Sequence, residues 1–243
     1  EFLPEIDNGS IDLVLTDPPW KISKEVAQRR GLNPQAYGTH LEEFTAGEWD
    51  FYEDEDSYKR FTEEWFTEAV RVCREGAHII SFFDLMRITY LVDLSRKLNC
   101  LPRQVLFYLL TNPVPRTCKI DFMVSVQAAP WFTKGTKSRD KATFNWELGE
   151  RVNYVAAPIP SSSKGIVRTH PTQKPYTVIK TWMMYLSNPG DLILDPFCGS
   201  GIVCYVAKQL NRRYIGIEKD GDFFLSAEQL LNQPTMVDMF EGG

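Results

Sequence analysis

LILDPFCGSGIVCYVAKQLNRRYIGIE, residues 192–218, is the stretch that decides the fold class of this chain. It sets a short apolar strand, a glycine-containing turn, an apolar helix and a second strand in direct succession. In a doubly wound fold this order brings the backbone at Gly199 and Gly201 close to a nucleotide, and Glu218 can accept hydrogen bonds from ribose hydroxyls. The third glycine of the dinucleotide fingerprint is missing, because Ile202 and Val203 begin the helix. The pattern therefore favours a nucleoside without pyrophosphate, although by itself it is also compatible with a turn that serves tight packing alone.

The rest of the chain continues this alternation of strands and helices. Apolar runs predict strands over 11–16, 77–83, 103–110 and 122–129, and helical spacing predicts helices from Ser57 to about Gly76, over 85–99, from Tyr176 to about Ser187, and after 218. Residues 134–168 lose this periodicity and are rich in Lys, Ser, Gly and Pro, so they are interpreted as a small irregular insertion. The alternation is typical of an α/β fold in three layers, with a mostly parallel twisted sheet and helices on both faces.

Composition excludes several classes of protein. The chain has 243 residues, 43% of them apolar, which is enough for the core of one large domain. No apolar run approaches the roughly 18 residues of a membrane span, and the first residues lack the layout of a secretory signal, so a soluble cytoplasmic protein is expected. The five cysteines include no CxxC pair, which argues against a disulfide framework and against a structural zinc site, and no metal is expected.

Charge is unevenly distributed, although the formal net charge is only -5. Eleven Asp or Glu residues lie between positions 42 and 68, whereas residues 151–190 contain five Lys or Arg and no acid. The basic segment is either an ordinary solvated face or a surface suited to the phosphates of a nucleic acid.

TDPPW, residues 16–20, follows the strand predicted at 11–16 and therefore stands at the carboxyl end of that strand. A residue before proline is restricted to extended backbone and proline has a fixed φ, so the corner from Asp17 to Trp20 has little freedom. Proline also lacks an N–H, which leaves carbonyl groups without a competing donor. A carboxylate, a bare carbonyl and an aromatic face presented together match the exocyclic amine and the ring of a nucleobase.

Four motifs occur in a fixed order: TDPPW (16–20), THPTQKP (169–175), DPFCGSG (195–201) and RRYIGIE (212–218). Together with FTEEWFTEAVRVCREGAHIISFF (61–83) and LFYLLTNPVPR (106–116), they resemble the beta class of amino-group DNA methyltransferases. The resemblance implies a Rossmann-like methyltransferase fold with circularly permuted motifs. It implies a catalytic half at 1–133, a target-recognition insertion at 134–168 and a cofactor-binding half at 169–243. Members of this class usually carry a further strand upstream of the first strand seen here, and this chain begins at EFLPEI without it.

The resemblance also implies roles for particular residues. Asp17, Pro18, Pro19 and Trp20 are expected to hold a base that has been rotated out of the duplex. The cofactor is expected to be S-adenosyl-L-methionine, bound by Asp17, His170, Thr172, Lys174, Asp195, Pro196, Phe197, Gly199, Ser200, Gly201 and Glu218. Within this set, Lys174 and Thr172 are expected at the methionine carboxylate, and His170 has either a direct or a structural role. The chain contains no Pro-Cys dipeptide, which disfavours the cysteine thiolate route of ring-carbon cytosine methylation. Cys198 is therefore interpreted as a small residue that fills the loop.

The expected reaction is methylation of adenine N6 in double-stranded DNA, because an aspartate at position 17 resembles the adenine-modifying members. Cytosine N4 methylation is the nearest alternative, and RNA is a more remote substrate. A catalytically silent DNA-binding subunit is a further alternative, whereas a dehydrogenase would leave TDPPW unexplained. Basic residues of the insertion, and also Arg29 and Arg30, are candidates for contact with DNA phosphates. A homodimer is expected to be possible, because the target-reading region is short.

Overall fold

The predicted alternation is present in a computed structural model of the chain, which describes residues 3–21, 52, 54–113, 122–135, 142–160 and 172–233. Its strands are β1 Ile11–Thr16, β2 Cys73–Ser81, β3 Cys100–Leu110, β4 Val126–Lys134, β5 Tyr154–Ala157, β6 Leu192–Asp195 and β7 Arg213–Gly216. Its helices are α3 Glu55–Val72, α4 Ile88–Lys97, α5 Tyr176–Leu186, α6 Ile202–Gln209 and α7 Gly221–Leu231, with short 3-10 turns η1 Leu3–Glu5, η4 Leu85–Arg87 and η6 Trp146–Leu148. None of the helices in these ranges has the length and apolar character needed to cross a bilayer.

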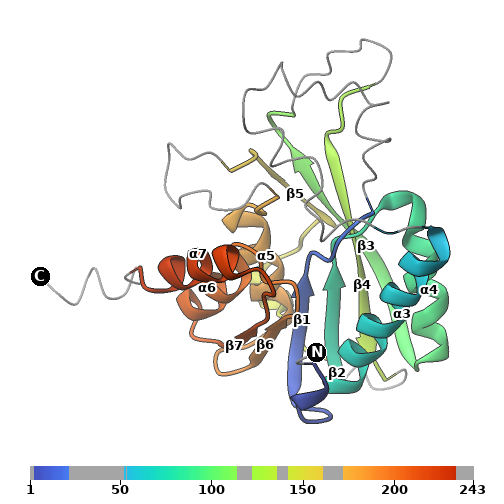
Figure 1. Ribbon diagram of the computed structural model, residues 1–243. Coiled ribbons are helices and arrows are strands. Elements are labelled where there is room, and N and C mark those ends of the chain that lie inside the picture. The colour runs from blue at the N-terminus through green and yellow to red at the C-terminus, as the bar shows by residue number, and fades with distance from the viewer. Residues whose placement is uncertain are drawn as a thin grey trace, which may run out of the picture.

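The strands form one sheet in the order β5-β3-β4-β2-β1-β6-β7 (Figure 1). The pairs β1–β2, β1–β6, β6–β7 and β3–β5 are parallel, and β4 runs antiparallel to both of its neighbours. A mostly parallel sheet is therefore confirmed. β1, which ends in the TDPPW corner, and β6, which ends in the glycine loop, are neighbours in this order and run parallel, so their carboxyl ends meet at one edge of the sheet.

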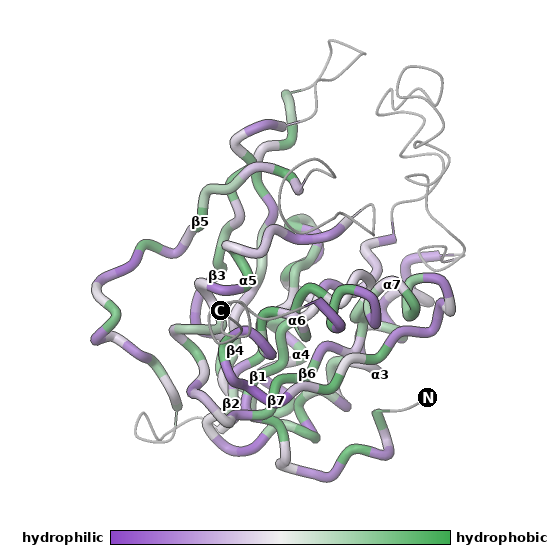
Figure 2. Tube along the Cα trace, turned by 90° about the vertical axis from the view of Figure 1, so that its left-hand side faces the viewer, coloured by the Kyte–Doolittle hydropathy of each residue, from purple (hydrophilic) through white to green (hydrophobic). Residues whose placement is uncertain are grey.

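Helices cover both faces of the sheet, as Figure 1 shows, with α3 and α4 on one side and α5, α6 and α7 on the other. Successive residues of β1 point to opposite faces. Leu13 and Leu15 belong to the core shared with α5 and α6, whereas Val14 belongs to the core shared with α3. Residues 202–207 of α6 are all buried, and its tube is coloured as hydrophobic over most of its length in Figure 2. The three-layer arrangement expected from the sequence is thus present.

Some element boundaries differ from the sequence prediction. α3 begins at Glu55 with Asp54 as its N-cap, whereas Ser57 was the predicted cap; the Asp54 side chain accepts a hydrogen bond from the Ser57 amide at 2.6 Å, and Ser57 completes a capping box. β2 begins at Cys73, where α3 ends, rather than after Gly76, because Cys73 pairs with Ile11. β4 spans 126–134 instead of 122–129, since its bounds follow from pairing with β3. A pairing partner distant in sequence leaves no local pattern.

The insertion at 134–168 is not irregular throughout, which corrects the interpretation of its composition. Its segment Tyr154–Ala157 forms β5, which pairs in parallel with Phe107–Leu110 of β3 and extends the sheet. Asn145 donates its side-chain amide to the carbonyl groups of Met184 and Ser187 at 2.8 and 3.0 Å. The described part of the insertion is therefore fastened to the end of α5 and to the edge of the sheet.

Candidate active site

The corner at Asp17–Trp20 leaves the sheet directly after β1. Phe82 donates its amide to the Thr16 carbonyl at 2.9 Å, so the end of β1 is still held by the segment that follows β2. Pro18 is buried, and the side chain of Asp17 is 22% exposed. The carboxylate thus lies at the surface of the core, where a ligand can reach it.

Both oxygens of the Asp17 carboxylate have partners. The Trp20 indole Nε1 donates to Oδ1 at 3.0 Å, and the Lys174 ammonium forms an ion pair with Oδ2. Burial raises the pKa of Asp17, and the ammonium of Lys174 and the two hydrogen bonds act in the opposite direction. Because each oxygen of an ionised carboxylate has two lone pairs, a further donor can be accepted on either oxygen.

Lys174, from the THPTQKP motif, lies at the corner. Its side chain is 7% exposed, and its ammonium lies 5.3 Å from the centre of the Trp20 ring and 4.8 Å from the centre of the Phe82 ring. Aromatic faces of this kind stabilise a partly desolvated cation. The expectation was that Lys174 would meet the methionine carboxylate of the cofactor, whereas its partner in the structure is Asp17. Lys174 can contact both Asp17 and the methionine carboxylate, since an ammonium has three N–H donors.

The glycine loop joins β6 to α6. Gly199 and Gly201 have φ of 50° and 76°, in the left-handed region that favours glycine. A Cβ at Gly201 would lie 2.8 Å from the Cβ of Ala227 on α7, so tight packing is one reason for this glycine. Tight packing is therefore part of the role of the loop, and at Gly199 the left-handed backbone is the reason for glycine.

Glu218 lies two residues beyond β7, and its carboxylate binds the backbone of the glycine loop. Its Oε2 accepts the Gly199 amide at 2.7 Å, and its Oε1 accepts the Asp220 amide at 2.9 Å. Each oxygen keeps a second lone pair, which suits a ribose hydroxyl. A carboxylate for hydroxyl groups, a lysine ammonium for a carboxylate and a helix N-terminus at a glycine turn form a donor set that fits S-adenosylmethionine.

A buried hydrogen bond joins the corner to the loop. The Thr16 hydroxyl donates to Asp195 Oδ1 at 2.6 Å, across the parallel pair of β1 and β6, and the Phe197 amide donates to the same oxygen at 3.1 Å. Asp195 is 3% exposed, and burial is the main cause that raises its pKa to about 7; the charges of Asp17 and Glu218 raise it further. The carboxylates of Asp17 and Glu218 are thus near enough to act on Asp195, and the motifs that carry the three residues lie around one site.

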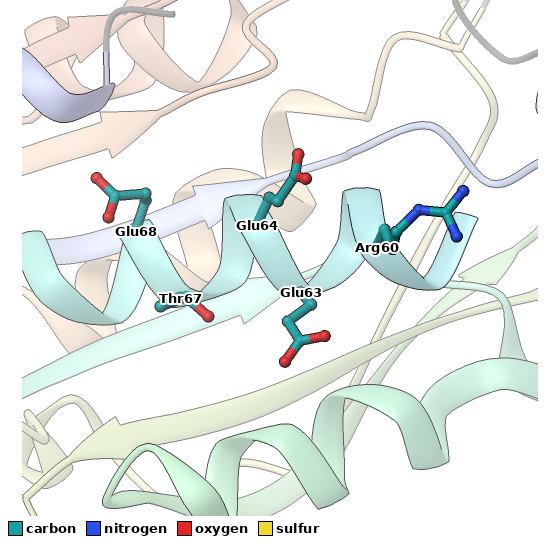
Figure 3. Close-up of a pocket in the computed structure, with 5 residues that line it drawn as sticks. All are labelled: Arg60, Glu63, Glu64, Thr67 and Glu68. Atoms are coloured by element: carbon teal, nitrogen blue, oxygen red, sulfur yellow. The ribbon is translucent and has the colours of Figure 1, made fainter. Parts of the chain in front are cut away.

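A hollow on the surface of α3 lies elsewhere. It is lined by Arg60, Glu63, Glu64, Thr67 and Glu68, whose side chains project from a single helix (Figure 3). It includes no residue of the corner or of the glycine loop. It therefore has no part in the candidate site.

The predicted site residues fall into three groups. Asp17, Trp20, Lys174, Asp195 and Glu218 are brought together by the contacts above, and Gly199 and Gly201 shape the loop between them. Cys198 is 7% exposed, with its sulfur 3.8 Å from that of Cys204, as expected for a loop filler. His170, Arg29 and Arg30 lie outside the described residues.

Sequence reasoning missed several residues that contact the corner. Phe82 at the end of the β2 region faces Lys174, and its position beside TDPPW follows from the pairing of β1 with β2. The Tyr58 hydroxyl donates to the Pro19 carbonyl at 3.0 Å, and Arg87 donates to the Trp20 carbonyl at 3.4 Å. Nothing in the local sequence around Tyr58 or Arg87 indicates these contacts, because each partner is distant along the chain.

Comparison with known proteins identifies a family. The DNA methylase family, in the N6/N4 group, matches residues 11–229. The chain is 30% identical over 250 residues to the type II methyltransferase M.HinfI of Haemophilus influenzae. The aligned region covers 96% of this chain and 66% of M.HinfI. The chain thus spans just under two thirds of the length of this relative.

Solved structures share the fold. The M1.HpyAVI–SAM complex has a TM-score of 0.68 at 23% identity and covers 96% of this chain and 92% of that one. The PvuII DNA methyltransferase, described as cytosine-N4-specific, has a TM-score of 0.74 at 16% identity and covers 99% of this chain and 86% of that one. This likeness confirms the Rossmann-like α/β fold. With the family model matched from β1 to α7, this chain belongs to the N6/N4 DNA methylase family, whose methyl donor is S-adenosylmethionine.

Proposed function

We propose that this chain transfers a methyl group from S-adenosylmethionine to the N6 amine of an adenine rotated out of duplex DNA. The observation that carries the proposal is the junction of the two halves: Thr16, next to Asp17, donates to Asp195 at the start of the glycine loop, at 2.6 Å. A base bound at the corner would lie beside a cofactor bound at the loop. Proximity of this kind is a large part of catalysis in a two-substrate reaction.

The corner offers two acceptors to an exocyclic amine. Asp17 can accept one N–H on a free lone pair, and the Pro18 carbonyl can accept the other. Among the described residues no hydrogen bond reaches the Pro18 carbonyl, whereas the next carbonyl, that of Pro19, accepts from Tyr58. Pro18 and Pro19 add no N–H that would compete.

The same acceptors would assist the chemistry. The amine of a purine is a poor nucleophile, because its lone pair is delocalised into the ring. Bound S-adenosylmethionine would supply an electrophilic methyl on a positively charged sulfur, which keeps the electron pair of the broken S–C bond and leaves as a neutral thioether. As the nitrogen takes this methyl it gains positive charge, which the Asp17 carboxylate stabilises from a fixed position, and the proton then leaves by way of Asp17 to solvent. Rotating the base out of the duplex costs a few kcal/mol. Stacking on Trp20, worth about 1–3 kcal/mol, offsets much of that cost.

Roles on the cofactor side follow from the loop. Glu218 would bind the ribose hydroxyls, and the Asp195–Gly201 loop, with Pro196, Phe197 and Ser200, would follow the methionine part. Lys174 and Thr172 would approach the methionine carboxylate, which requires Lys174 to share its donors with Asp17. Residues of the 134–168 insertion would contact the DNA.

Cytosine N4 methylation remains the alternative, because an exocyclic amine on cytosine would use the same acceptors. The PvuII methyltransferase is cytosine-N4-specific, but at 16% identity its similarity to this chain bears on the fold alone. A catalytically silent subunit is the other alternative. It is disfavoured because Asp17, Trp20 and the glycine loop all keep chemically competent residues.

Nucleoside mass spectrometry of DNA incubated with the protein and S-adenosylmethionine tests the proposal. We expect N6-methyladenine. N4-methylcytosine without N6-methyladenine would overturn the choice of base. Absence of both products, together with tight DNA binding, would favour the silent subunit.

Asp17→Ala tests the assigned acceptor. We expect methyl transfer to fall by on the order of 10²–10³-fold or more, because a preorganised acceptor is lost. The dissociation constant of S-adenosylmethionine should stay within about threefold, since the main contact of Asp17 is with the base. Asp93→Ala, an exposed aspartate on α4, is the matched control. Wild-type turnover in Asp17→Ala would contradict the role.

A further inference from the structure

The backbone of the Asp17–Trp20 corner is held by side chains from two other elements. Tyr58, in the first turns of α3, is fully buried, and its hydroxyl donates to the Pro19 carbonyl at 3.0 Å. Arg87, at the end of η4, donates through Nη1 to the Trp20 carbonyl at 3.4 Å, a longer and weaker bond. Two consecutive carbonyl groups of the corner are thus anchored to the protein.

The two donors are linked to each other. The Arg87 guanidinium lies 5.4 Å from the centre of the Tyr58 ring. It also binds Glu55 in a two-pronged manner, with Nε to Oε1 at 2.8 Å and Nη2 to Oε2 at 3.2 Å. Glu55 accepts two more hydrogen bonds, from the Tyr90 hydroxyl at 2.7 Å and from the Lys21 ammonium at 3.3 Å. A planar guanidinium held by a carboxylate in this way has little rotational freedom.

The start of α3 places Glu55 and Tyr58 together. They are three residues apart and so share one face of the helix. The capping box formed by Asp54 and Ser57 determines where the helix begins, and therefore which residues occupy this face.

We propose that Tyr58 and Arg87 are positioning residues, which hold the corner so that the Asp17 carboxylate and the Pro18 carbonyl face the target amine. The inference rests on the proposed function of the corner. The pattern of contacts supports it: the Pro19 and Trp20 carbonyls accept hydrogen bonds, whereas within the described residues the Pro18 carbonyl accepts none.

The residue after the corner supports the same inference. Lys21 has φ of 55°, a left-handed conformation that a non-glycine residue adopts at a cost. Such a conformation persists when the surroundings determine it, and here the Lys21 ammonium is bonded to Glu55, the partner of Arg87. The backbone is thus left-handed at Lys21, directly after the two bonded carbonyls.

Tyr58→Phe tests the hydroxyl and keeps the ring in the core. We expect kcat for methyl transfer to fall by on the order of 10–100-fold, because small displacements of reacting groups cost about that much. The affinity for S-adenosylmethionine should stay within about threefold. Tyr108→Phe is the matched control, since the buried Tyr108 hydroxyl, on β3, has no hydrogen-bond partner among the described residues. A merely structural tyrosine would lower the unfolding temperature and leave kcat of the folded protein unchanged.

Arg87→Lys tests the second donor. It keeps the charge and removes the two-pronged contact with Glu55, so we expect a smaller fall in kcat, about three- to tenfold. Arg96→Lys on α4 is the control, because Arg96 forms an exposed pair with Asp93, three residues earlier, as Arg87 does with Asp84. Wild-type kcat in both Tyr58→Phe and Arg87→Lys would overturn the inference.

The carbonyl carbon chemical shifts of Pro19 and Trp20 separate this inference from the proposed function, since they report the hydrogen bonds that these carbonyls accept and need no turnover. Loss of an accepted hydrogen bond moves a carbonyl carbon upfield, so Tyr58→Phe should shift the Pro19 carbon and Arg87→Lys the Trp20 carbon, whereas the two controls should leave both unchanged. Unchanged shifts in both variants overturn the anchoring of the corner, whatever the activity. If the wild type transfers no methyl group and the shifts nevertheless move in the variants, the proposed function fails and the anchoring stands.

Discussion

Asp195 is a buried carboxylate between the two halves of the site. Its pKa of about 7 in the folded protein, raised mainly by burial, contrasts with 3.8 for an ordinary aspartate. Between these values the folded chain binds more protons than the unfolded chain. The proton bound by Asp195 therefore stabilises the folded chain in full below about pH 4. This part of the free energy of unfolding is lost as the pH rises to about 7.

Asp195→Asn should remove this pH dependence. The amide oxygen can still accept from Thr16 and from the Phe197 amide, whereas the charge is gone. Relative to wild type, the variant should gain stability as the pH rises, by up to about 4 kcal/mol across the interval, at about 1.4 kcal/mol per pH unit. Urea unfolding at about pH 5 and pH 8 measures the difference, with the exposed Asp222→Asn as control. A difference between variant and wild type that is constant with pH would contradict the assignment.

Glu218 has two roles, one in the structure of the glycine loop and one proposed in cofactor binding, and Glu218→Ala removes both. It orders the glycine loop through the amides of Gly199 and Asp220, and it is proposed to bind the ribose. Hydrogen bonds to a charged acceptor are worth about 1.5–3 kcal/mol. We therefore expect Glu218→Ala to weaken S-adenosylmethionine by on the order of 10–100-fold in a calorimetric titration, and Glu228→Ala on the exposed side of α7 to leave affinity unchanged. An unaltered dissociation constant for Glu218→Ala would remove this residue from the site.

At the scale of elements, the start of α6 depends on contact with α7. Gly201 is the N-cap of α6, and a Cβ there would lie 2.8 Å from the Cβ and 3.1 Å from the Cα of Ala227. Backbone atoms cannot move aside as the end of a flexible side chain can. The two helices and the glycine loop therefore form one packed unit.

Gly201→Ala should consequently cost more than left-handed strain alone. Gly190→Ala is the matched control, since Gly190 has φ of 88° and nothing lies within 4 Å of its added Cβ. The control should lose about 1 kcal/mol of unfolding free energy and Gly201→Ala about 2–4 kcal/mol. Cofactor affinity should fall in Gly201→Ala alone. Equal losses of stability in the two variants would show that the contact with Ala227 contributes nothing.

Elements differ in how well the sequence predicts them. β1, α5, β6 and α6 match their predictions closely, because each has a strong apolar pattern and is bounded by prolines, glycines or polar turns. β5 escaped prediction, since the four residues Tyr154–Ala157 become a strand through pairing with β3. The sequence predicts Ser57 as the cap of α3 because serine is a favoured cap residue, whereas Asp54, three residues earlier, is the cap and Ser57 completes the capping box.

For the molecule as a whole, the net charge of -5 has the same sign as DNA and disfavours its binding. Any attraction must therefore come from basic residues grouped on one part of the surface. We expect affinity for non-specific duplex DNA to fall with salt, with a log–log slope of about −3 or steeper, at about −0.9 per phosphate contact. Arg151→Gln, exposed in the insertion, should reduce the slope by about 0.9, and Lys59→Gln on the acidic α3 should leave it unchanged. Fluorescence anisotropy measures both. Equal slopes for all three proteins would exclude Arg151 from the DNA contact.

Local patterns were enough to predict the fold class, the order of the motifs and those candidate site residues that lie within a motif, because strand and helix periods, proline corners and glycine turns are local properties. The tertiary structure decided which of these residues touch. Thr16 and Asp195 are 179 positions apart and Asp17 and Lys174 are 157 apart, yet each pair is bonded, because β1 and β6 are neighbours in the sheet and the segment before α5 returns to the corner. Tyr58 and Arg87 reach the same corner from α3 and η4. Contacts of this kind depend on packing and pairing across the fold, which no stretch of the chain encodes alone.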